Sequence, residues 1–372
     1  MNAIKHKNKI IKAALLFLAI ICLTACSNSG SGQTGSGNAG AAQSSGNADA
    51  AQSNGSADHI RIITTIFPEY DWVRNVLGEN PAGIDLTLLI DNGVDPHSFQ
   101  PSVEDIMKIG TCDLLVYVGG ESDKWVADVL KQPGSERVKQ LNLMQILGDR
   151  AKTEEIVEGM EGHEDHESHE DHEDHENHVN HEDHEDHEDH EEAEEYDEHV
   201  WLSLRNAETF TASIAKSLSE LDPENAETYQ KNAEAYQAEL QKLDSEYTEA
   251  VANGAQNTLL FGDRFPFRYL TEDYGLEYYA AFAGCSAETE ASFETITFLA
   301  QKTDELGLKT VLTIDGSDQR IAETIISATK EKNQKILEMD SMQSVSRKDL
   351  EAGTDYLHIM RHDLEILKQA LQ

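Results

Sequence analysis

Short apolar runs alternate with amphipathic segments along most of the chain, a pattern typical of α/β proteins. In the first part of the chain Ser102 is followed three residues later by Asp105, a spacing that resembles a capping box and predicts the start of a helix. The other elements predicted here are strands at 61–67, 84–90 and 113–118 and a helix at 68–78. Strand, helix, strand, helix and strand in this order indicate an α/β lobe.

One long helix is predicted from Pro223 to Gly254, because apolar residues recur along it at spacings of three or four and share one face. These residues are Tyr229, Ala233, Tyr236, Leu240, Leu243, Tyr247 and Val251. At about 1.5 Å per residue, roughly 30 residues span about 45 Å, which exceeds one small lobe. We therefore expect a rigid helix that lies along two lobes.

A second α/β series follows the long helix. Strands are predicted at 258–262, 277–282, 310–314 and 335–339, and helices at 265–274, 293–306, 319–330 and 356–371. The predicted fold is two α/β lobes joined by one long backbone helix. Ligands of open α/β sheets bind at the carboxyl ends of the strands, so we expect the binding site in the cleft between the lobes.

The N-terminus resembles a bacterial lipoprotein signal peptide. Several lysines precede an apolar run from Ala13 to Leu23, which is too short to span a bilayer comfortably and ends in Leu23-Thr24-Ala25-Cys26. We expect Cys26 to be lipidated and to become the first residue of the mature protein. The next residues are almost wholly Ser, Gly, Asn, Ala and Gln, a composition typical of a flexible tether.

A histidine stands at every third position from His163 to His190, and the residues between are mostly Asp and Glu. Such His-rich tracts are typical of metal binding, because imidazole is a common ligand for borderline metals. The alternative is a disordered acidic linker whose histidines have no function. The regular placement of a histidine at every third position argues against this alternative. The predicted auxiliary ligands are His163, His166, His169, His172, His175, His178, His181, His184, His187 and His190.

These features divide the chain into seven predicted segments. They are a signal peptide at 1–25, a tether at 26–58, an N-terminal lobe at 59–150, a disordered His/Asp/Glu-rich loop at 151–198, the end of the N-terminal lobe at 199–221, the linking helix at 222–254 and a C-terminal lobe at 255–372.

The formal net charge of −41 excludes a nucleic-acid-binding role, because an acidic surface repels phosphate. Residues 161–198 supply 21 acids and no Lys or Arg, so about half of the excess belongs to the His-rich insert. Cys112 and Cys285 are expected in different halves of the molecule, so a disulfide between them is not favoured.

Four side chains that can bind a metal stand at predicted strand ends or in adjoining loops. They are His97, His199, Asp263 and Asp340. Each alone has a simpler explanation, since a loop histidine is usually a hydrogen-bonded surface residue and an aspartate after a strand is usually a helix cap. Four such residues at one cleft, in a chain that also carries a His-rich insert, indicate a metal site.

The motifs around these histidines resemble the zinc- and manganese-binding solute receptors of ABC importers. The resemblance begins with Asp95-Pro96-His97-Ser98-Phe99 and continues, after the His-rich loop, with His199-x-Trp201-Leu202-Ser203. It extends to the run from Phe267 to Leu276 and to the tail from Tyr356, and so covers residues 61–372. The resemblance implies a bilobal α/β protein with one long helix between the lobes, often a lipoprotein.

The resemblance also implies the cleft ligands, with His97 and His199 from the first lobe and Asp340 from the second. The family's third ligand, a His or Glu, is replaced by Arg264, whose guanidinium has no lone pair to offer a metal. Asp263 is the first substitute that we predict, and Cys285 is a further candidate because a thiolate binds zinc well. Alternatively Arg264 pairs with Asp263 or Asp340 and leaves a three-ligand site.

We expect the cargo to be Zn²⁺ rather than Mn²⁺, because the His-rich loop favours zinc over the oxygen-loving manganese. The predicted function is an extracytoplasmic receptor, a monomer held to the outer face of the membrane by its lipid anchor alone, that delivers zinc to an ABC importer permease. A Mn²⁺ receptor and a surface zinc store or adhesin are the alternatives. We do not expect an enzyme, because the sequence has no HExxH or comparable arrangement for a zinc hydrolase.

Overall fold

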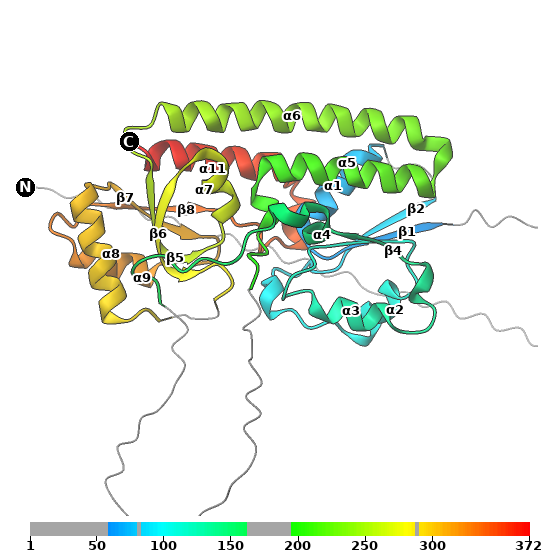
Figure 1. Ribbon diagram of the computed structural model, residues 1–372, viewed down its shortest axis with the longest axis horizontal. Coiled ribbons are helices and arrows are strands. Elements are labelled where there is room, and N and C mark those ends of the chain that lie inside the picture. The colour runs from blue at the N-terminus through cyan, green and yellow to red at the C-terminus, as the bar shows by residue number, and fades with distance from the viewer. Residues whose placement is uncertain (1–58, 80–82, 162–194, 287–289) are drawn as a thin grey trace, which may run out of the picture. The chain divides into compact units, whose positions relative to one another are not determined.

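The computed structural model describes residues 59–79, 83–161, 195–286 and 290–372 (Figure 1). The predicted signal peptide, Cys26, the tether and the histidines from His163 to His190 lie outside the described residues. Within the described part, two parallel β-sheets form the centres of two α/β lobes, as the sequence predicts.

The first lobe contains a four-stranded sheet in the order β2-β1-β3-β4, with all neighbouring strands parallel. Its strands are β1 (Ile60–Thr64), β2 (Ile84–Leu88), β3 (Leu114–Tyr117) and β4 (Lys139–Asn142). Its helices are α1 (Phe67–Leu77), α2 (Val103–Ile109), α3 (Lys124–Leu130), α4 (Leu143–Leu147) and α5 (Leu204–Leu221). The predicted capping box at the start of α2 is confirmed, since Asp105 N donates to Ser102 Oγ and Ser102 N donates to Asp105 Oδ2.

The second lobe repeats this arrangement with the strand order β6-β5-β7-β8, again all parallel. Its strands are β5 (Thr258–Phe265), β6 (Glu277–Ala283), β7 (Thr310–Ile314) and β8 (Lys335–Met339). Its helices are α7 (Arg268–Tyr274), α8 (Phe293–Leu306), α9 (Arg320–Ala328), α10 (Arg347–Glu351) and α11 (Tyr356–Ala370). In both sheets the order reverses next to the first strand, where open α/β sheets bind ligands.

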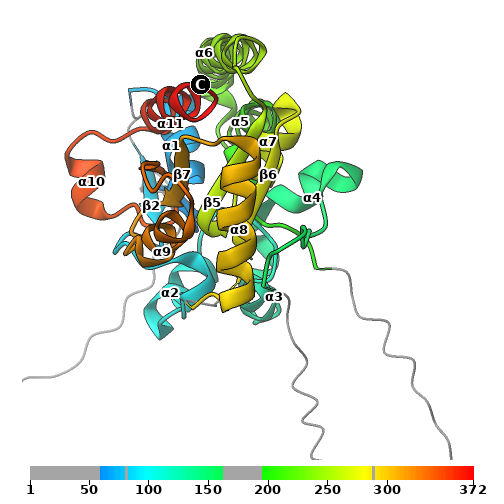
Figure 2. The same ribbon diagram turned by 90° about the vertical axis from the view of Figure 1, so that its left-hand side faces the viewer.

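The long helix α6 (Ala226–Ala252) has 27 residues and runs above α5 of the first lobe and α11 of the second (Figure 1). The end-on view in Figure 2 shows α6 stacked on α11, outside both sheets. Six of the seven apolar residues of its predicted stripe are buried against these elements: Tyr229, Ala233, Tyr236, Leu240, Leu243 and Tyr247. The helix thus packs against both lobes through one face.

The predicted bounds of α8, β7 and β8 match the structure, but four short elements, α3, β4, α4 and α10, were not predicted. One difference affects the site. Strand β5 was expected to end at Gly262, yet it continues through Phe265, with a shift of its register against β6 between Phe261 and Arg264. Asp263 therefore lies inside a strand, and the helix expected from Phe265 begins only at Arg268.

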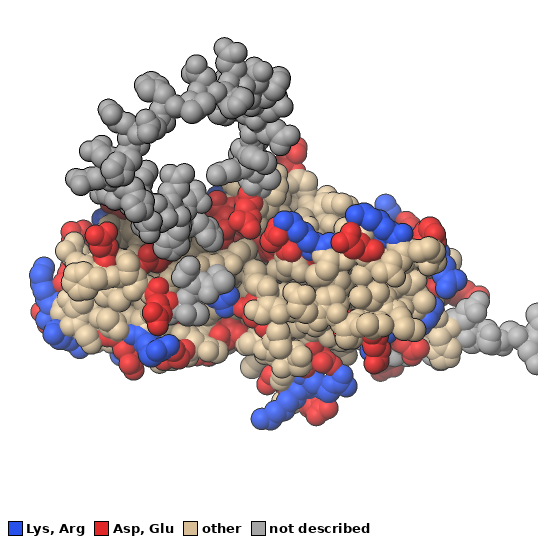
Figure 3. Space-filling view, turned by 90° about the horizontal axis from the view of Figure 1, so that it is seen from below, with Lys and Arg blue, Asp and Glu red and all other residues tan. Residues whose placement is uncertain are grey.

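On the face of the molecule shown in Figure 3, acidic and basic side chains are interspersed over both lobes. This mixture agrees with the assignment of much of the acidic excess to the His-rich insert. None of the helices in the described residues has both the length and the apolar composition required to cross a bilayer.

Candidate metal centre

Three side chains with metal-binding atoms come together between the lobes. The ligand atoms of His97, His199 and Cys285 all lie within 4.8 Å of one another. Zinc binds nitrogen and sulfur at about 2.0–2.3 Å, so ligands around one tetrahedral ion lie roughly 3.5 Å apart. A small contraction of the group would therefore allow all three atoms to bind a single ion.

His97 is placed by a short 3₁₀ turn, Pro96–Ser98, in the loop after β2. Asp95 Oδ1 accepts both the backbone N–H of His97, at 3.0 Å, and its ring Nδ1, at 2.8 Å. A carboxylate only accepts, so Nδ1 carries the hydrogen and the lone pair is on Nε2. That Nε2 atom is buried and makes no hydrogen bond with any of the described residues.

His199 is held in the same way. It is fully buried at the start of the 3₁₀ turn Val200–Leu202. Asp197 Oδ1 accepts its backbone N–H at 2.8 Å and its ring Nδ1 at 3.0 Å. Both histidines thus follow an aspartate by two residues, and each aspartate fixes the tautomer and the ring so that Nε2 is available for a metal.

Cys285 reaches this pair from the second lobe, just after β6. Gly284 makes the approach possible, because a Cβ there would lie 2.9 Å from His199 Cε1 and from Phe265 O. Burial, and then the carboxylates of Asp197, Glu154 and Glu198, raise the pKa of the Cys285 thiol. The ion-free site therefore holds a thiol, and a bound cation would favour the thiolate.

The structure does not bring the two predicted carboxylate ligands into this group. Asp263 lies within β5, where its Oδ1 accepts the N–H of Arg264 at 2.9 Å. Asp340 follows β8, but its Oδ1 accepts the N–H of Met342 at 2.8 Å and stabilises the turn. Burial, and then nearby Asp315, raise the pKa of Asp340 to about 7.

Arg264 forms an ion pair that the sequence did not predict. Its Nη2 donates to Asp95 Oδ2 at 2.7 Å, whereas Asp263 and Asp340 were the expected partners. The continuation of β5 past its bulge places Arg264 at the interlobe surface opposite Asp95. The guanidinium of Arg264 thus contacts the aspartate that orients His97.

Gln343, which the sequence analysis did not single out, lies against both imidazoles. Its Nε2 is 3.1 Å from His199 Nε2 and 3.3 Å from His97 Nδ1. Only its position four residues after β8, in the loop where an acidic ligand was sought, could have indicated it.

A cavity of about 430 Å³ borders this centre beside Asp95 and Arg264. Its walls also carry Asp263, Asp315 and Asp318. Carboxylates outnumber cationic groups here, which favours the approach of a cation.

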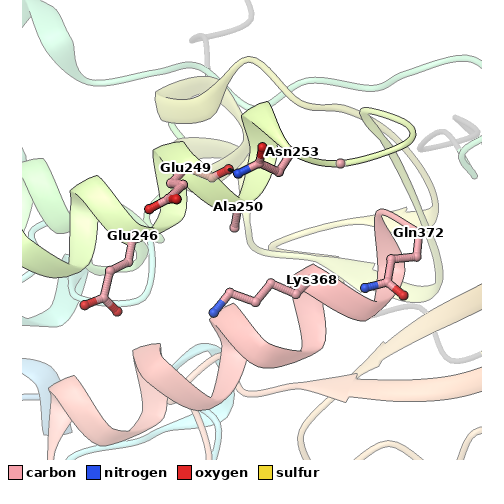
Figure 4. Close-up of a pocket in the computed structure, with 7 residues that line it drawn as sticks. Glu246, Glu249, Ala250, Asn253, Lys368 and Gln372 are labelled. Carbon is pink, nitrogen blue, oxygen red and sulfur yellow. Dashed lines mark hydrogen bonds between the residues drawn. The ribbon is translucent and has the colours of Figure 1, made fainter.

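A separate cavity of about 420 Å³ lies between α6 and α11 (Figure 4). Lys368 extends from α11 toward the part of α6 that carries Glu246 and Glu249, and Asn253 Nδ2 donates to the backbone oxygen of Glu249. None of the described residues that line this cavity is a His or Cys. It lacks the donors that zinc prefers, so we assign no metal to it.

The family of the chain follows from comparison with known proteins. A family model described as "Zinc-uptake complex component A periplasmic" matches residues 62–370. The chain belongs to this family. The resemblance inferred from the sequence motifs is therefore confirmed, and the family is one of substrate-binding transport proteins rather than of enzymes.

Members of the family with curated names are similar over most of this chain. The zinc-binding protein AdcA of Streptococcus pyogenes is 30% identical over 309 residues, which are 83% of this chain and 55% of that protein. The chain thus spans about half the length of that relative. The high-affinity zinc uptake system protein ZnuA of Bacillus subtilis is 28% identical over 312 residues, 84% of this chain and 88% of that protein.

A solved structure in the family has the same fold. The Zn(II)-bound ZnuA-like domain of Streptococcus pneumoniae AdcA is 26% identical, with a TM-score of 0.61. The superposition covers 84% of this chain and 98% of that chain. The two-lobed architecture with its long helix is therefore that of the family.

Proposed function

We propose that this protein captures Zn²⁺ at His97, His199 and Cys285 and delivers it to the permease of an ABC importer. The observation that carries the proposal is the convergence of these three ligand atoms within 4.8 Å, in a chain of the zinc-uptake family. Two imidazoles and a thiolate form a nitrogen and sulfur set that suits zinc. The names of the relatives, which describe zinc-binding and zinc-uptake proteins, support the same cargo.

Manganese is the less favoured cargo. Mn²⁺ prefers carboxylate, carbonyl and water oxygens, and a thiolate is a soft ligand that it binds poorly. The two carboxylates that would have suited manganese, Asp263 and Asp340, are not in the group of three. The donor set therefore favours zinc.

We infer the place of action from the N-terminal residues of the sequence, which resemble a lipoprotein signal. Lipidation of Cys26 would hold the receptor at the outer face of the membrane, and the tether would let the lobes reach the permease. The tract from His163 to His190 would collect zinc at many weak sites just before His199. Collection should weaken as the pH falls toward about 6, because imidazoles must be neutral to bind a metal.

Calorimetric titration of the mature protein with Zn²⁺ and Mn²⁺ tests the cargo and the site. We expect Cys285→Ser to lower zinc affinity at least about tenfold, because it replaces a soft thiolate with a hydroxyl. Cys112→Ala is the matched control, since Cys112 is buried in the first lobe. Equal zinc affinity of Cys285→Ser and the control, or tighter binding of Mn²⁺ than of Zn²⁺, would contradict the proposal.

Uptake of labelled zinc by cells with and without the gene tests delivery. At low external zinc, a receptor for a permease raises uptake, whereas a surface store or adhesin leaves it unchanged. Complementation with Cys285→Ser separates the two roles within one strain, because the variant retains the lobes and the His-rich tract. Unchanged uptake in cells without the gene would exclude the receptor function.

A further inference from the structure

A short antiparallel ladder lies beside the candidate metal centre. It pairs residues 152–154 with residues 195–197, and two backbone hydrogen bonds of 2.7 and 2.9 Å flank the bridge between the central residues of the two strands. Successive side chains of a strand point to opposite faces. Glu154 and Asp197, each next to a central residue, therefore lie on the same face of this interlobe ladder.

The two carboxylates on this face contact residues of different lobes. Asp197 Oδ1 accepts both the backbone N–H and the ring Nδ1 of His199, in the first lobe. Glu154 Oε1 accepts the backbone N–H of Cys285, in the second lobe, at 3.1 Å. The interlobe ladder thus carries one support for a proposed zinc ligand of each lobe.

Cys285 lies in a turn at the end of β6. Ser286 N donates to Ala283 O across this turn at 3.3 Å, and the N–H of Cys285 points out of the turn to Glu154. A hydrogen bond from an amide to a carboxylate is stronger than one between two neutral groups. The contact with Glu154 therefore fixes the backbone from which Cys285 Sγ reaches the imidazoles.

Tyr269 of α7 fixes the interlobe ladder to the second lobe. Its side chain is buried, and its hydroxyl accepts the N–H of Lys152 at 2.9 Å and donates to the backbone oxygen of Asp197 at 3.1 Å. Beyond the ladder, Glu161 N donates to Ala281 O of β6 at 3.0 Å. The segment that leaves α4 in the first lobe thus lies against the second lobe (Figure 1).

The position of the Cys285 backbone is critical for a shared ion. The three proposed ligand atoms lie within 4.8 Å of one another, whereas ligands around one tetrahedral zinc ion lie roughly 3.5 Å apart. A small displacement of this backbone therefore decides whether Cys285 Sγ reaches an ion bound by the two imidazoles.

We propose that Glu154 is a positioning residue of the zinc site, which holds the backbone of Cys285 so that the thiolate meets the ion. This inference rests on the proposed zinc function. Glu154 acts through Cys285 and is not one of the three residues whose ligand atoms converge. Its removal should therefore change zinc binding only through the thiolate.

Glu155, the next residue, provides a matched control. Its Oε2 lies 3.0 Å from Arg268 Nη1 and 3.2 Å from the hydroxyl of Tyr278. These contacts dock the same segment on the second lobe without involving Cys285. Glu155→Ala therefore loosens the segment but leaves the carboxylate of Glu154 in place.

Three single variants of the full mature chain test this role by Zn²⁺ titration and by Co²⁺ absorption spectra, in which a thiolate ligand gives a charge-transfer band. We expect Glu154→Ala to bind zinc about tenfold more weakly, as is typical of lost support at metal sites, and to weaken the thiolate band. Glu154→Gln should restore most of the affinity, because its carboxamide oxygen also accepts the N–H of Cys285. Glu155→Ala should retain the wild-type affinity and spectrum.

A double variant distinguishes positioning of the thiolate from a general effect on the lobes. Glu154→Ala combined with Cys285→Ala should bind zinc as Cys285→Ala alone does, because no thiolate is left to position. Two independent effects on zinc affinity would instead add.

The outcomes separate this inference from the function on which it rests. If Cys285→Ala weakens zinc binding but Glu154→Ala has wild-type affinity and an unchanged Co²⁺ spectrum, the positioning role is wrong and the receptor stands. An additive loss in the double variant, an equal loss in Glu155→Ala, or a failure of Glu154→Gln to restore affinity would also overturn the positioning role. If Cys285→Ala has no effect, the proposed site itself fails.

Discussion

Arg264 Nη2 in β5 lies 2.7 Å from Asp95 Oδ2, and the other oxygen of the same carboxylate accepts His97 Nδ1 at 2.8 Å. Arg264 thereby acts, through one intermediate residue, on the imidazole of His97, a proposed zinc ligand in the other lobe. Burial alone would raise the pKa of Asp95, but the hydrogen bond from His97 and the charge of Arg264 hold that pKa well below its usual range. Asp95 therefore stays ionised and keeps His97 in the tautomer that leaves Nε2 free.

Removal of the guanidinium should weaken this arrangement. In Arg264→Ala the carboxylate of Asp95, about three-quarters buried, loses its cationic partner. We expect the free energy of unfolding to fall by about 1–3 kcal/mol, the usual cost of leaving a buried polar group without its partner. Zinc affinity should fall as well, because His97 is held less firmly.

Denaturant unfolding and zinc titration of Arg264→Ala, Asp95→Asn and the double variant measure the coupling. The two single effects should not add, since both break the same ion pair. Arg347→Ala, another interlobe arginine, which pairs with Asp91, controls for a general loss of lobe contact. Strict additivity of the Arg264 and Asp95 effects would show that the pair does not act as a unit.

Glu69, in the first turn of α1, should make the stability of the first lobe depend on pH. The side chain is fully buried, and its Oε2 accepts the N–H groups of Thr65 and Ile66 at 2.8 and 3.2 Å. Its Oε1 has no partner among the described residues. Burial, and then the nearby carboxylate of Asp123, raise the pKa of Glu69 well above its usual value of 4.5.

A raised carboxyl pKa in the folded state means that the folded protein binds this proton more tightly than the unfolded chain. The stabilisation from Glu69 is therefore complete below pH 4.5 and is lost as the pH rises through the folded pKa. Glu69→Gln removes this pH-dependent contribution to the free energy of unfolding. The free energy of unfolding of the variant should therefore rise relative to that of the wild-type protein as the pH rises. Denaturant unfolding of both proteins between acidic and neutral pH checks this, and a pH-independent difference would contradict it.

Deletion of residues 163–190 tests the role of the His-rich tract. The three proposed ligands, His97, His199 and Cys285, lie outside the deleted segment, so one high-affinity zinc should remain. The total number of bound zinc ions should fall, because ten histidines are lost. Calorimetric titration separates the two classes of site, and loss of the high-affinity site would show that the tract is the principal binding site.

Local signals in the sequence predicted much of the fold. The apolar stripe from Tyr229 to Tyr247 is buried along α6, and Ser102 with Asp105 caps α2 as expected. The residues of short elements such as α3 and β4 show no clear periodic recurrence of apolar side chains, so these elements were not predicted from the sequence. The end of β5 could not be predicted either, because its extension past Gly262 depends on pairing with β6 across a register shift.

The grouping of His97, His199 and Cys285 in space was predicted in part, and their role as metal ligands stays a prediction. His97 and His199 were predicted as ligands because their motifs combine histidine with fixed neighbours, and Cys285 was named as a candidate from its place after a strand. Asp263 and Asp340 were predicted from similar positions, but neither belongs to the group of three, and one oxygen of each accepts a nearby backbone N–H. Gln343 gave no signal, because an amide becomes significant only through its distances to two imidazoles.

The most direct test of the central claim is a crystal structure of the zinc-loaded mature protein with anomalous scattering measured at the zinc edge. The account predicts one strong anomalous peak bonded to His97 Nε2, His199 Nε2 and Cys285 Sγ. A principal peak at Asp263 or Asp340, or one that leaves Cys285 unbound, would contradict it.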